Sequence, residues 1–531
     1  MKSLFRIGAI TLAAAIVGTS LSGCGQTSSS GSSSGKGTSS SSNSYSMFMR
    51  STYVDWIKDL KWYNQAEKQT GIHVNYVKGP DDFDKFYSEV DQRVISGHVP
   101  DATMTKLSQT NVYGPQGVFK DLAPDIKKYA PHLQAYIDKN SEYKALVTDS
   151  KGAIYGIAKE TPIFADLIGY RADQFKKAGI DASKVKTVDD FTNALRKLKA
   201  YYGKSNKNYY PLSGRDTAIR FAAWFGCPSS ISAQASHGVY VGHYKDGSID
   251  IMNPNCYKMV QTMRTWYKEG LINPQWVNGT LSEADWESAM LNGNGSVFYD
   301  YYNRADWFME NGGKKSDPNY DMQILNFLTD NAGKTMKVTT SEKYNDELVT
   351  AISSKASDST VQTILKFIDF FYTDAGQTLA NYGVEGQSFK TQSDGSKKFI
   401  ADYSTEESKP LGTKKWSFLS DRFTVCKPVN DAAFFQWNAP LIANATKKLF
   451  VPENLLTSYT LKFTEQQSKD LSNLIATEYD AQMSGITAFV SGSKDLTPAT
   501  WSSFQQRMNN DGLSKIENIQ LDAYKNTYGN K

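Results

Sequence analysis

The chain has 531 residues and a formal net charge of +4, and 13% of its residues are aromatic. Basic and acidic residues are interspersed, with no basic stripe, so we expect no nucleic-acid partner. A hydrophobic content of 40% allows a large core, and the length fits two domains. Beyond the N-terminus, no run reaches the roughly 20 apolar residues that a membrane-spanning helix needs.

The N-terminus has the pattern of an export signal. Two basic residues precede an apolar run over 7–17, and small residues follow it. The run is too short to span a bilayer, and this order is typical of a signal peptide. Residues 21–24 (LSGC) resemble a bacterial lipobox, in which the cysteine is acylated and becomes the first residue after cleavage. We therefore expect a lipoprotein signal peptide over 1–23 and a lipid on Cys24; an unmodified cysteine near an ordinary cleavage site is the alternative.

A tract of mostly Ser, Gly, Thr and Asn follows over 24–44. Such a composition cannot bury a core, so we expect a disordered tether. A Gly/Ser coil of this length has a root-mean-square span of about 25 Å. The prediction is a globule held at the extracellular face of the cytoplasmic membrane by its lipid.

Cysteines and histidines indicate no metal or redox chemistry. Cys227, Cys256 and Cys426 are odd in number and form no CxxC pair, so neither a disulfide framework nor a zinc site is predicted, although one bridge stays open. His237 and His243 are six residues apart in a glycine-rich piece, which is a weak metal pattern. No phosphate-binding glycine loop or hydrolase motif is present, and we expect no cofactor.

The first elements predict an α/β fold. Strands over 45–50 and 72–77 flank a helix over 56–69, which is the order of a βαβ unit. A helix over 83–96 and a short strand over 100–104 follow.

Later segments are mostly helical. Thr187 and Asp190 form a capping-box pattern, and so do Thr464 and Gln467. Apolar residues at helical spacing support further helices. The expected helices lie over 187–202, 257–268, 359–372, 464–492 and from 497 onward. The C-terminal region is therefore predicted to be helical.

Six short segments, in the same order as in the family, resemble the large extracellular solute-binding proteins of family 1, the substrate-binding lipoproteins of Gram-positive ABC importers. They are 67–72 (EKQTGI), 96–101 (SGHVPD), 155–158 (YGIA), 169–175 with 179–180 (GYRADQF, GI), 267–274 (YKEGLINP) and 381–386 (NYGVEG). Each segment is weakly specific alone, whereas six in order behind a lipobox are specific.

The resemblance implies a two-lobed α/β fold with a hinge and a ligand cleft between the lobes. It places 45–160 and 327–385 in lobe one, and 161–326 and 386–531 in lobe two. It also implies an oligosaccharide ligand, delivery to an ABC transporter permease, and a monomer. Pocket residues would come from loops of both lobes, which close over the ligand by hinge bending.

Sugar sites combine aromatic rings with fixed polar groups, and the segment 297–307 has this mixture. Its candidate ligand-binding residues are Tyr299, Tyr301, Tyr302, Arg304 and Trp307. The alternative is that Phe298, Tyr299 and Trp307 belong to the core of lobe two.

Two other segments supply candidates. Trp224 lies on a background of small residues and could stack on a sugar, and Asp216 could accept hydrogen bonds from sugar hydroxyls; a helix with a buried Trp is the alternative. Glu160 and Phe164 lie beside the first expected crossing between lobes, with a surface loop as the alternative. Weaker candidates are Tyr53, Glu385 and Trp437.

Some members of the resembling family carry a calcium loop after the helix that corresponds to 187–202. In this chain the corresponding stretch, 203–211 (GKSNKNYYP), has no carboxylate. Since calcium sites depend on Asp and Glu oxygens, we predict no calcium there.

The leading hypothesis is a binding protein without catalysis that captures an oligosaccharide. A receptor for a peptide or another small solute is the first alternative. A surface-anchored glycosidase would need two carboxylates about 5–10 Å apart, which no spacing selects. A surface adhesin is the last alternative.

Overall fold

The computed structural model describes residues 43–57, 60–215, 250–330, 337–400 and 426–529, together with the single residues Ala218, Phe221, Phe225 and Gly333. Expectations for the signal peptide, Cys24, Asp216, Trp224 and Cys227 lie outside this part of the chain. None of the helices in the described ranges combines the length and the apolar character needed to cross a bilayer.

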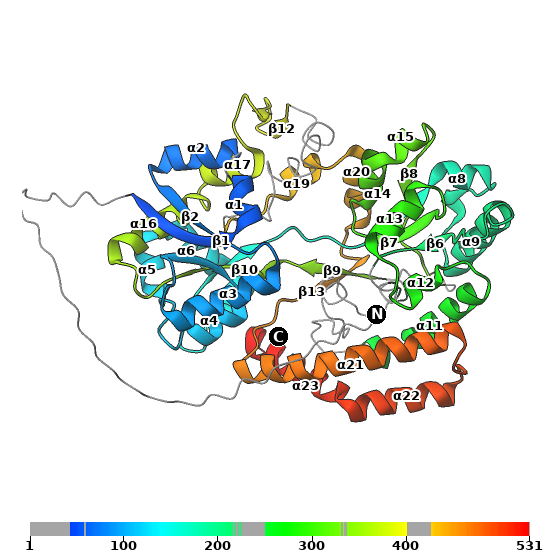
Figure 1. The fold of residues 1–531 in the computed structure, drawn as a ribbon. Coiled ribbons are helices and arrows are strands. Elements are labelled where there is room, and N and C mark those ends of the chain that lie inside the picture. The colour runs from blue at the N-terminus through cyan, green and yellow to red at the C-terminus, as the bar shows by residue number, and fades with distance from the viewer. Residues whose placement is uncertain are drawn as a thin grey trace, which may run out of the picture. The chain divides into compact units, whose positions relative to one another are not determined.

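One sheet has five strands in the order β2-β1-β3-β10-β4. The strands are β1 (Ser44–Arg50), β2 (His73–Gly79), β3 (Ala102–Thr105), β4 (Ile157–Glu160) and β10 (Tyr344–Ile352). Strands β2 and β3 both pair parallel with β1, while β10 runs antiparallel to β3 and β4. The parallel pairing of β1 and β2 confirms the predicted βαβ unit (Figure 1).

The predicted helix over 56–69 is instead two helices, α1 (Ser51–Ile57) and α2 (Lys61–Thr70). Leu60, which immediately precedes α2, has an extended backbone and a buried side chain. The helical conformation is therefore interrupted at a residue that packs into the core. Helix α3 (Phe83–Ser96) matches its prediction. It begins at Asp82, whose carboxylate accepts a hydrogen bond from the Lys85 amide, and it ends at Gly97 with φ 71°.

Helices pack against this sheet around an aromatic core. They are α4 (Leu107–Tyr113), α5 (Ala123–Tyr129), α6 (Pro131–Lys139), α7 (Ser141–Val147), α16 (Asp358–Phe370) and α17 (Asp374–Tyr382). Phe48 of β1 stacks on Phe86 of α3 with ring centres 4.8 Å apart. Asp369 accepts hydrogen bonds from the amides of His132 and Leu133, so a carboxylate satisfies the N-terminus of α6.

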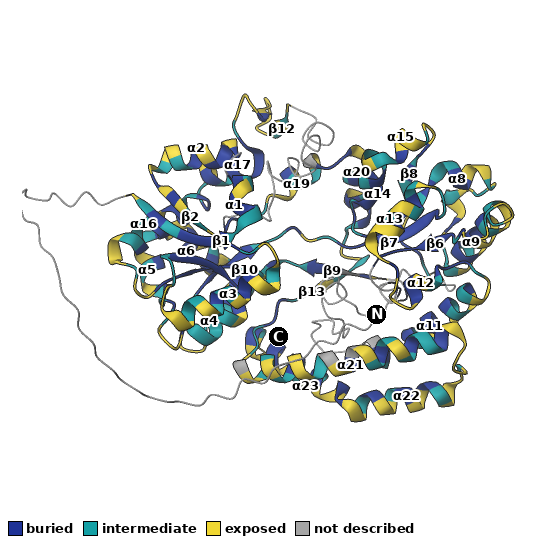
Figure 2. Cartoon of the chain, viewed as in Figure 1, coloured by how far each residue is buried: buried dark blue, intermediate teal, exposed yellow. Residues whose placement is uncertain are grey.

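The other sheet has four strands in the order β6-β7-β5-β8. The strands are β5 (Leu167–Arg171), β6 (Leu212–Ser213), β7 (Val297–Asp300) and β8 (Met322–Ile324). Strand β6 is parallel to β7, and β5 is antiparallel to both β7 and β8. All four residues of β7 are buried (Figure 2).

The helices around this sheet are α8 (Ala172–Lys177), α9 (Val188–Tyr202), α11 (Pro254–Lys268), α12 (Pro274–Val277), α13 (Glu283–Leu291), α14 (Arg304–Phe308) and α15 (Lys314–Ser316). The predicted capping box of α9 is confirmed. The Asp190 amide donates to the Thr187 hydroxyl, and the Thr187 amide donates to the Asp190 carboxylate.

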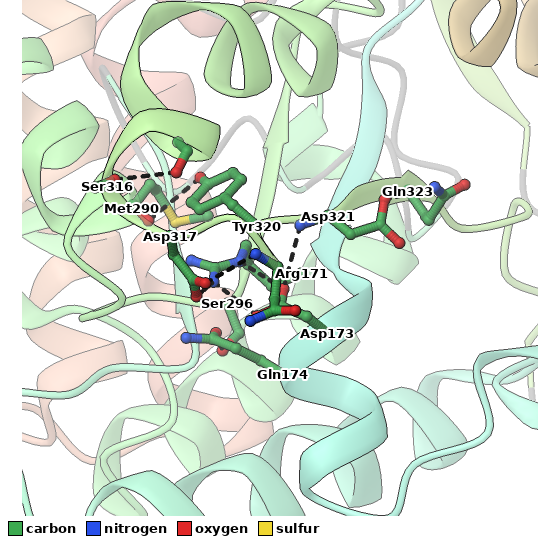
Figure 3. A network of polar contacts seen from close by, with 12 residues as sticks. Arg171, Asp173, Gln174, Met290, Ser296, Ser316, Asp317, Tyr320, Asp321 and Gln323 are labelled. Atoms are coloured by element: carbon green, nitrogen blue, oxygen red, sulfur yellow. Dashed lines mark hydrogen bonds and ion pairs between the residues drawn. The ribbon is translucent and has the colours of Figure 1, made fainter.

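Arg171, the last residue of β5, contacts both α8 and the segment that precedes β8 (Figure 3). Its guanidinium donates two 2.8 Å hydrogen bonds to Asp173 and lies 3.7 Å from the ring centre of Tyr320. Asp317 adds a second ion pair at 3.6 Å. The Arg and Asp of the segment 169–175 therefore form a buried structural ion pair.

Three extended passages link the two sheets. The stretch 161–165, between β4 and β5, pairs with β9 (Val338–Glu342): the Thr161 amide donates to the Lys343 carbonyl and the Ser341 amide to the Phe164 carbonyl, both at 2.7 Å. Strand β13 (Leu455–Ser458) pairs parallel with β9. The lobe boundaries expected from the resemblance also imply three crossings, at 160/161, 326/327 and 385/386, and these positions stay a prediction.

Residues beyond 386 contact both halves of the fold. The thiol of Cys426 lies 3.2 Å from the Ile157 carbonyl of β4, within the core of the first sheet. The Lys462 ammonium bonds the Ala145 carbonyl of α7 at 2.9 Å. By contrast, Phe489 and Trp501 lie in the core of the second sheet. The division into lobes at the expected boundaries stays a proposal.

The C-terminal helices are α19 (Asp431–Trp437), α20 (Pro440–Leu449), α21 (Glu465–Ser491), α22 (Pro498–Asp511) and α23 (Leu513–Tyr528). The predicted capping box at Thr464 is confirmed, and α21 ends at Gly492 with φ 87°. A Cβ atom on Gly485 would lie 2.3 Å from the ring of Phe504, so only glycine permits this approach of α21 to α22.

A polar group interrupts the buried face of α21. Glu478 and Gln482 have no exposed surface, and Gln520 of α23 is 3% exposed. Neither carboxylate oxygen of Glu478 has a hydrogen-bond partner among the described residues. The pKa of Glu478 is raised to about 7, mainly by burial and in smaller part by Asp511 of α22, while Arg507 acts in the opposite direction.

We expect Glu478→Gln to change the pH dependence of stability. Because the folded pKa lies above the ordinary value of 4.5, protonated Glu478 favours the fold. Its contribution is fully present below pH 4.5 and is lost as pH rises through about 7. The melting temperature of the variant, relative to the wild type, should therefore rise by roughly 2–5 °C between pH 5 and pH 8.

Scanning calorimetry at several pH values checks this. Glu453→Gln, at an exposed position, is the matched control and should leave the pH profile unchanged. Parallel profiles for the wild type and Glu478→Gln would contradict the prediction.

Candidate functional site

The parallel strands β6 and β7 end beside each other, and a buried carboxylate lies at that end. The Arg215 Nε atom donates to both oxygens of Asp300 at 3.1 and 2.9 Å, and the Arg304 Nε atom donates to Asp300 Oδ2 at 3.0 Å. Asp300 has no exposed surface. Two guanidinium groups thus compensate one fully buried charge.

Two further carboxylates from α13 complete the cluster. The Arg304 Nη1 atom donates to Glu287 and Nη2 donates to Glu283, both at 2.8 Å. The Glu283 side chain is 48% exposed, which makes it the outermost carboxylate. Burial raises the pKa of Glu287, with Arg304 acting in the opposite direction. We call Arg215, Glu283, Glu287, Asp300 and Arg304 the arginine network.

Aromatic rings lie against this network. The Arg215 guanidinium is 4.3 Å from the ring centre of Tyr301, and the Arg304 guanidinium is 5.1 Å from that of Trp307. Phe164, in the passage between β4 and β5, meets Tyr301 edge-on with ring centres 6.3 Å apart. All three rings are only partly buried. We call Phe164, Tyr301 and Trp307 the aromatic rim.

Two other candidates of the same segment lie in the core of the second sheet. Tyr299 is 1% exposed, and its ring centre is 5.6 Å from that of Phe221. Tyr302 is 4% exposed and packs against Phe434, with ring centres 5.8 Å apart. For Tyr299 this placement agrees with the alternative that it belongs to the core, and Tyr302, expected in the cleft, lies in the core as well.

Two candidates belong to the first sheet. Glu160, the last residue of β4, accepts a 2.5 Å hydrogen bond from the Tyr136 hydroxyl and lies 3.4 Å from the Lys343 ammonium. Burial and Glu160 raise the pKa of Tyr136. Tyr53 of α1 is 4% exposed, and the Arg50 guanidinium lies 4.7 Å from its ring centre.

The candidate Glu385 makes its contacts beside a hairpin and not in the arginine network. Glu385 accepts hydrogen bonds from the Thr391 hydroxyl and amide beside the hairpin of β11 (Phe389–Thr391) and β12 (Lys397–Phe399). These bonds lower the pKa of Glu385. Trp437 ends α19, and its side chain lies outside the description. Asp216 and Trp224 also lie outside the described residues.

Arg215, Glu283 and Glu287 are not among the candidates that the sequence pattern indicates. A signal for the two glutamates was present, because they are four residues apart and therefore share one face of α13. Their common partner, Arg304, lies on a different element, and this long-range pairing leaves no mark in the local sequence.

No metal site is evident within the described residues. Those ranges contain no group of three or more His, Cys, Asp and Glu side chains suited to a metal ion. In the stretch 203–211, Asn206 holds the turn by accepting a hydrogen bond from the Asn208 amide. The absence of calcium there stays a prediction. Cys256 and Cys426 are buried free thiols.

A sequence profile of a protein family matches residues 61–383, and its description is "Bacterial extracellular solute-binding protein". The match covers more than half of the chain.

Two curated relatives are similar in sequence. Lipoprotein LipO of Bacillus subtilis is 24% identical over 339 residues, which cover 61% of this chain and 63% of LipO. The fructooligosaccharide ABC transporter substrate-binding protein FusA of Streptococcus pneumoniae is 27% identical over 346 residues, which cover 61% of this chain and 59% of FusA. The chain thus spans less than two thirds of the length of either relative.

Solved structures share the fold. Alginate-binding protein AlgQ2 superposes with a TM-score of 0.69 at 18% identity, covering 91% of this chain and 98% of AlgQ2. FusA of S. pneumoniae in complex with kestose superposes with a TM-score of 0.65 at 19% identity, covering 92% and 99%. The fold and the family match confirm the resemblance seen in the six segments: the chain belongs to the bacterial extracellular solute-binding proteins and has their two-lobed α/β fold.

Proposed function

We propose that this protein is the substrate-binding component of an ABC importer and that its ligand is an oligosaccharide. The observation that carries the proposal is the aromatic rim, which lies against fixed polar groups where β6 and β7 end. Ligands of α/β proteins commonly bind beyond the carboxyl ends of parallel strands. FusA, a relative of this chain, is named for fructooligosaccharide, which supports a sugar ligand.

The two kinds of group suit the two faces of a sugar. Tyr301 and Trp307 offer partly exposed ring surface on which the apolar CH face of a sugar ring can stack. Glu283 and Glu287 offer carboxylate oxygens, held in place by Arg304, that can accept hydrogen bonds from hydroxyl groups. Because these positions are set by ion pairs, little side-chain entropy is lost on binding.

The passages between the sheets supply the hinge in this proposal. Phe164 lies in one of these passages, and its ring contacts the ring of Tyr301, which follows the second sheet. Glu160, at the end of β4, belongs to the first sheet. A ligand that contacts residues of both lobes favours the closed state. Tyr53 and Glu160 are the proposed contacts from lobe one.

The lipid anchor completes the mechanism that we propose. Acylated Cys24 and the tether over 24–44 would hold a monomeric receptor at the outer face of the cytoplasmic membrane, close to its permease. The relative LipO is named a lipoprotein, which supports this placement.

The glycosidase alternative is disfavoured by the family. A glycosidase requires a pair of carboxyl groups that act on a scissile bond, whereas the chain belongs to the bacterial extracellular solute-binding proteins, which bind their substrates without converting them. A peptide or another small solute is the remaining alternative.

We expect Tyr301→Ala and Trp307→Ala to raise the Kd for the bound oligosaccharide roughly tenfold each, because each removes a stacking ring. Isothermal titration calorimetry of the protein from Tyr45 onward, against fructo-, malto-, cello- and xylo-oligosaccharides, measures this. Tyr201→Ala removes a 51% exposed tyrosine of α9 and is the matched control. Unchanged affinity in both rim variants would remove these residues from the site, and binding of peptides alone would replace the ligand class.

We expect the bound oligosaccharide to be recovered chemically unchanged. We also expect its binding to make the protein more compact. Small-angle scattering with and without the ligand should show a smaller radius of gyration in the complex, since hinge closure brings the lobes together. Chromatography of the recovered sugar is the parallel measurement. New sugar products would support the glycosidase, and an unchanged radius would contradict closure.

A further inference from the structure

The arginine network is arranged so that no guanidinium edge of Arg304 is left for a ligand. Its Nε, Nη1 and Nη2 atoms each donate to a different protein carboxylate, at 3.0, 2.8 and 2.8 Å. An arginine that recognises a ligand carboxylate normally presents two parallel N–H groups to it. Here the protein's own carboxylates occupy those groups.

The second arginine also pairs with carboxylates of the network, through its Nε atom. The Arg215 Nε atom contacts both oxygens of Asp300, and Glu283 lies 3.9 Å from the same atom. The aromatic ring of Tyr301 lies over its guanidinium. Both arginines are buried, with 9% of their surface exposed.

The balance of charge in the network is negative. Among the five described side chains of the network, two guanidinium groups face three carboxylates, which gives this set a formal charge of −1. Since Glu283 is 48% exposed, the group nearest to solvent is an anion. A ligand carboxylate at the aromatic rim would meet like charge in a partly desolvated place, which costs more than in water.

Lys343, whose carbonyl accepts a hydrogen bond from the Thr161 amide of the passage, is also paired. Its ammonium group lies 3.4 Å from Glu160. The Lys343–Glu160 pair therefore adds no net positive charge beside Phe164.

We propose that the site takes uncharged oligosaccharides, and that Glu283 and Glu287 act as specificity residues that exclude glycans carrying carboxylates, such as uronides. The inference rests on the proposed function and narrows it. The neutral hydroxyl groups of a sugar can donate to these two carboxylates, whereas a uronide presents a further anion to them.

The first arm of the test compares neutral and acidic sugars of the same backbone. Cello- and manno-oligosaccharides are titrated beside the corresponding glucuronate and mannuronate oligomers, together with fructo- and xylo-oligosaccharides, in low salt. We expect a neutral sugar to bind at least 100-fold more tightly than any uronide. Tighter binding of a uronide would overturn the inference and leave the proposed function intact, while binding of no glycan would overturn both.

The second arm changes the charge directly. The double variant Glu283→Gln, Glu287→Gln retains amide oxygens of similar shape and changes the formal charge of the network from −1 to +1. We expect the affinity for uronides relative to neutral sugars to rise at least tenfold, and this gain to shrink in high salt. An unchanged ratio would overturn the assignment of these residues as specificity residues.

Two further variants complete the design. Glu269→Gln removes the partner of Arg196, an ion pair with N–O distances of 2.6 and 2.7 Å on α9, and should leave the ratio unchanged. If the double variant does not fold, as judged by its melting curve, Glu283→Gln alone serves, because this side chain is half exposed. We expect it to raise the ratio in the same direction by at least threefold.

Discussion

The arrangement of the proposed site depends on the buried carboxylate of Asp300, whose negative charge must be compensated by neighbouring cations. Asp300 ends β7 with no exposed surface, and an isolated charge there would be strongly unfavourable. Arg215, just beyond β6, and Arg304, at the start of α14, both donate to it. These two contacts fix the ends of two parallel strands and one helix relative to each other. The position of Tyr301, one residue after Asp300, follows from them.

A second constraint comes from the passages between the sheets. The chain 161–165 hydrogen-bonds to β9, and β9 pairs with β13, so three linkers form one narrow ribbon. This ribbon carries Phe164 to the rings of Tyr301 and Tyr302. The part of the molecule that would bend in a hinge therefore also contributes a side chain to the proposed site, which links ligand contact to closure.

Local signals predicted the elements well. The capping boxes at Thr187 and Thr464 begin helices as expected, and Gly97 ends α3, because caps depend only on neighbouring residues. The prediction of one helix over 56–69 was wrong in one respect. Two helices are present, and Leu60 before the second one is extended and buried in the core. The aromatic residues after β7 could not be sorted into core and site, since β7 is buried on both faces and the alternation that marks a half-exposed strand is absent.

Local sequence patterns were enough to predict the α/β class, the boundaries of the few helices with clear caps or apolar spacing, an export signal and, through six ordered segments, the family. Each of these depends on residues close together in the chain. The long-range contacts of the folded chain were needed to show that Arg171 forms a buried ion pair with Asp173. They were also needed to show that Arg304 binds three carboxylates, two of them from α13. Charge balance in a site depends on which groups lie within a few ångströms, and partners such as Arg215 and Asp300, 85 positions apart, are brought together only by the fold.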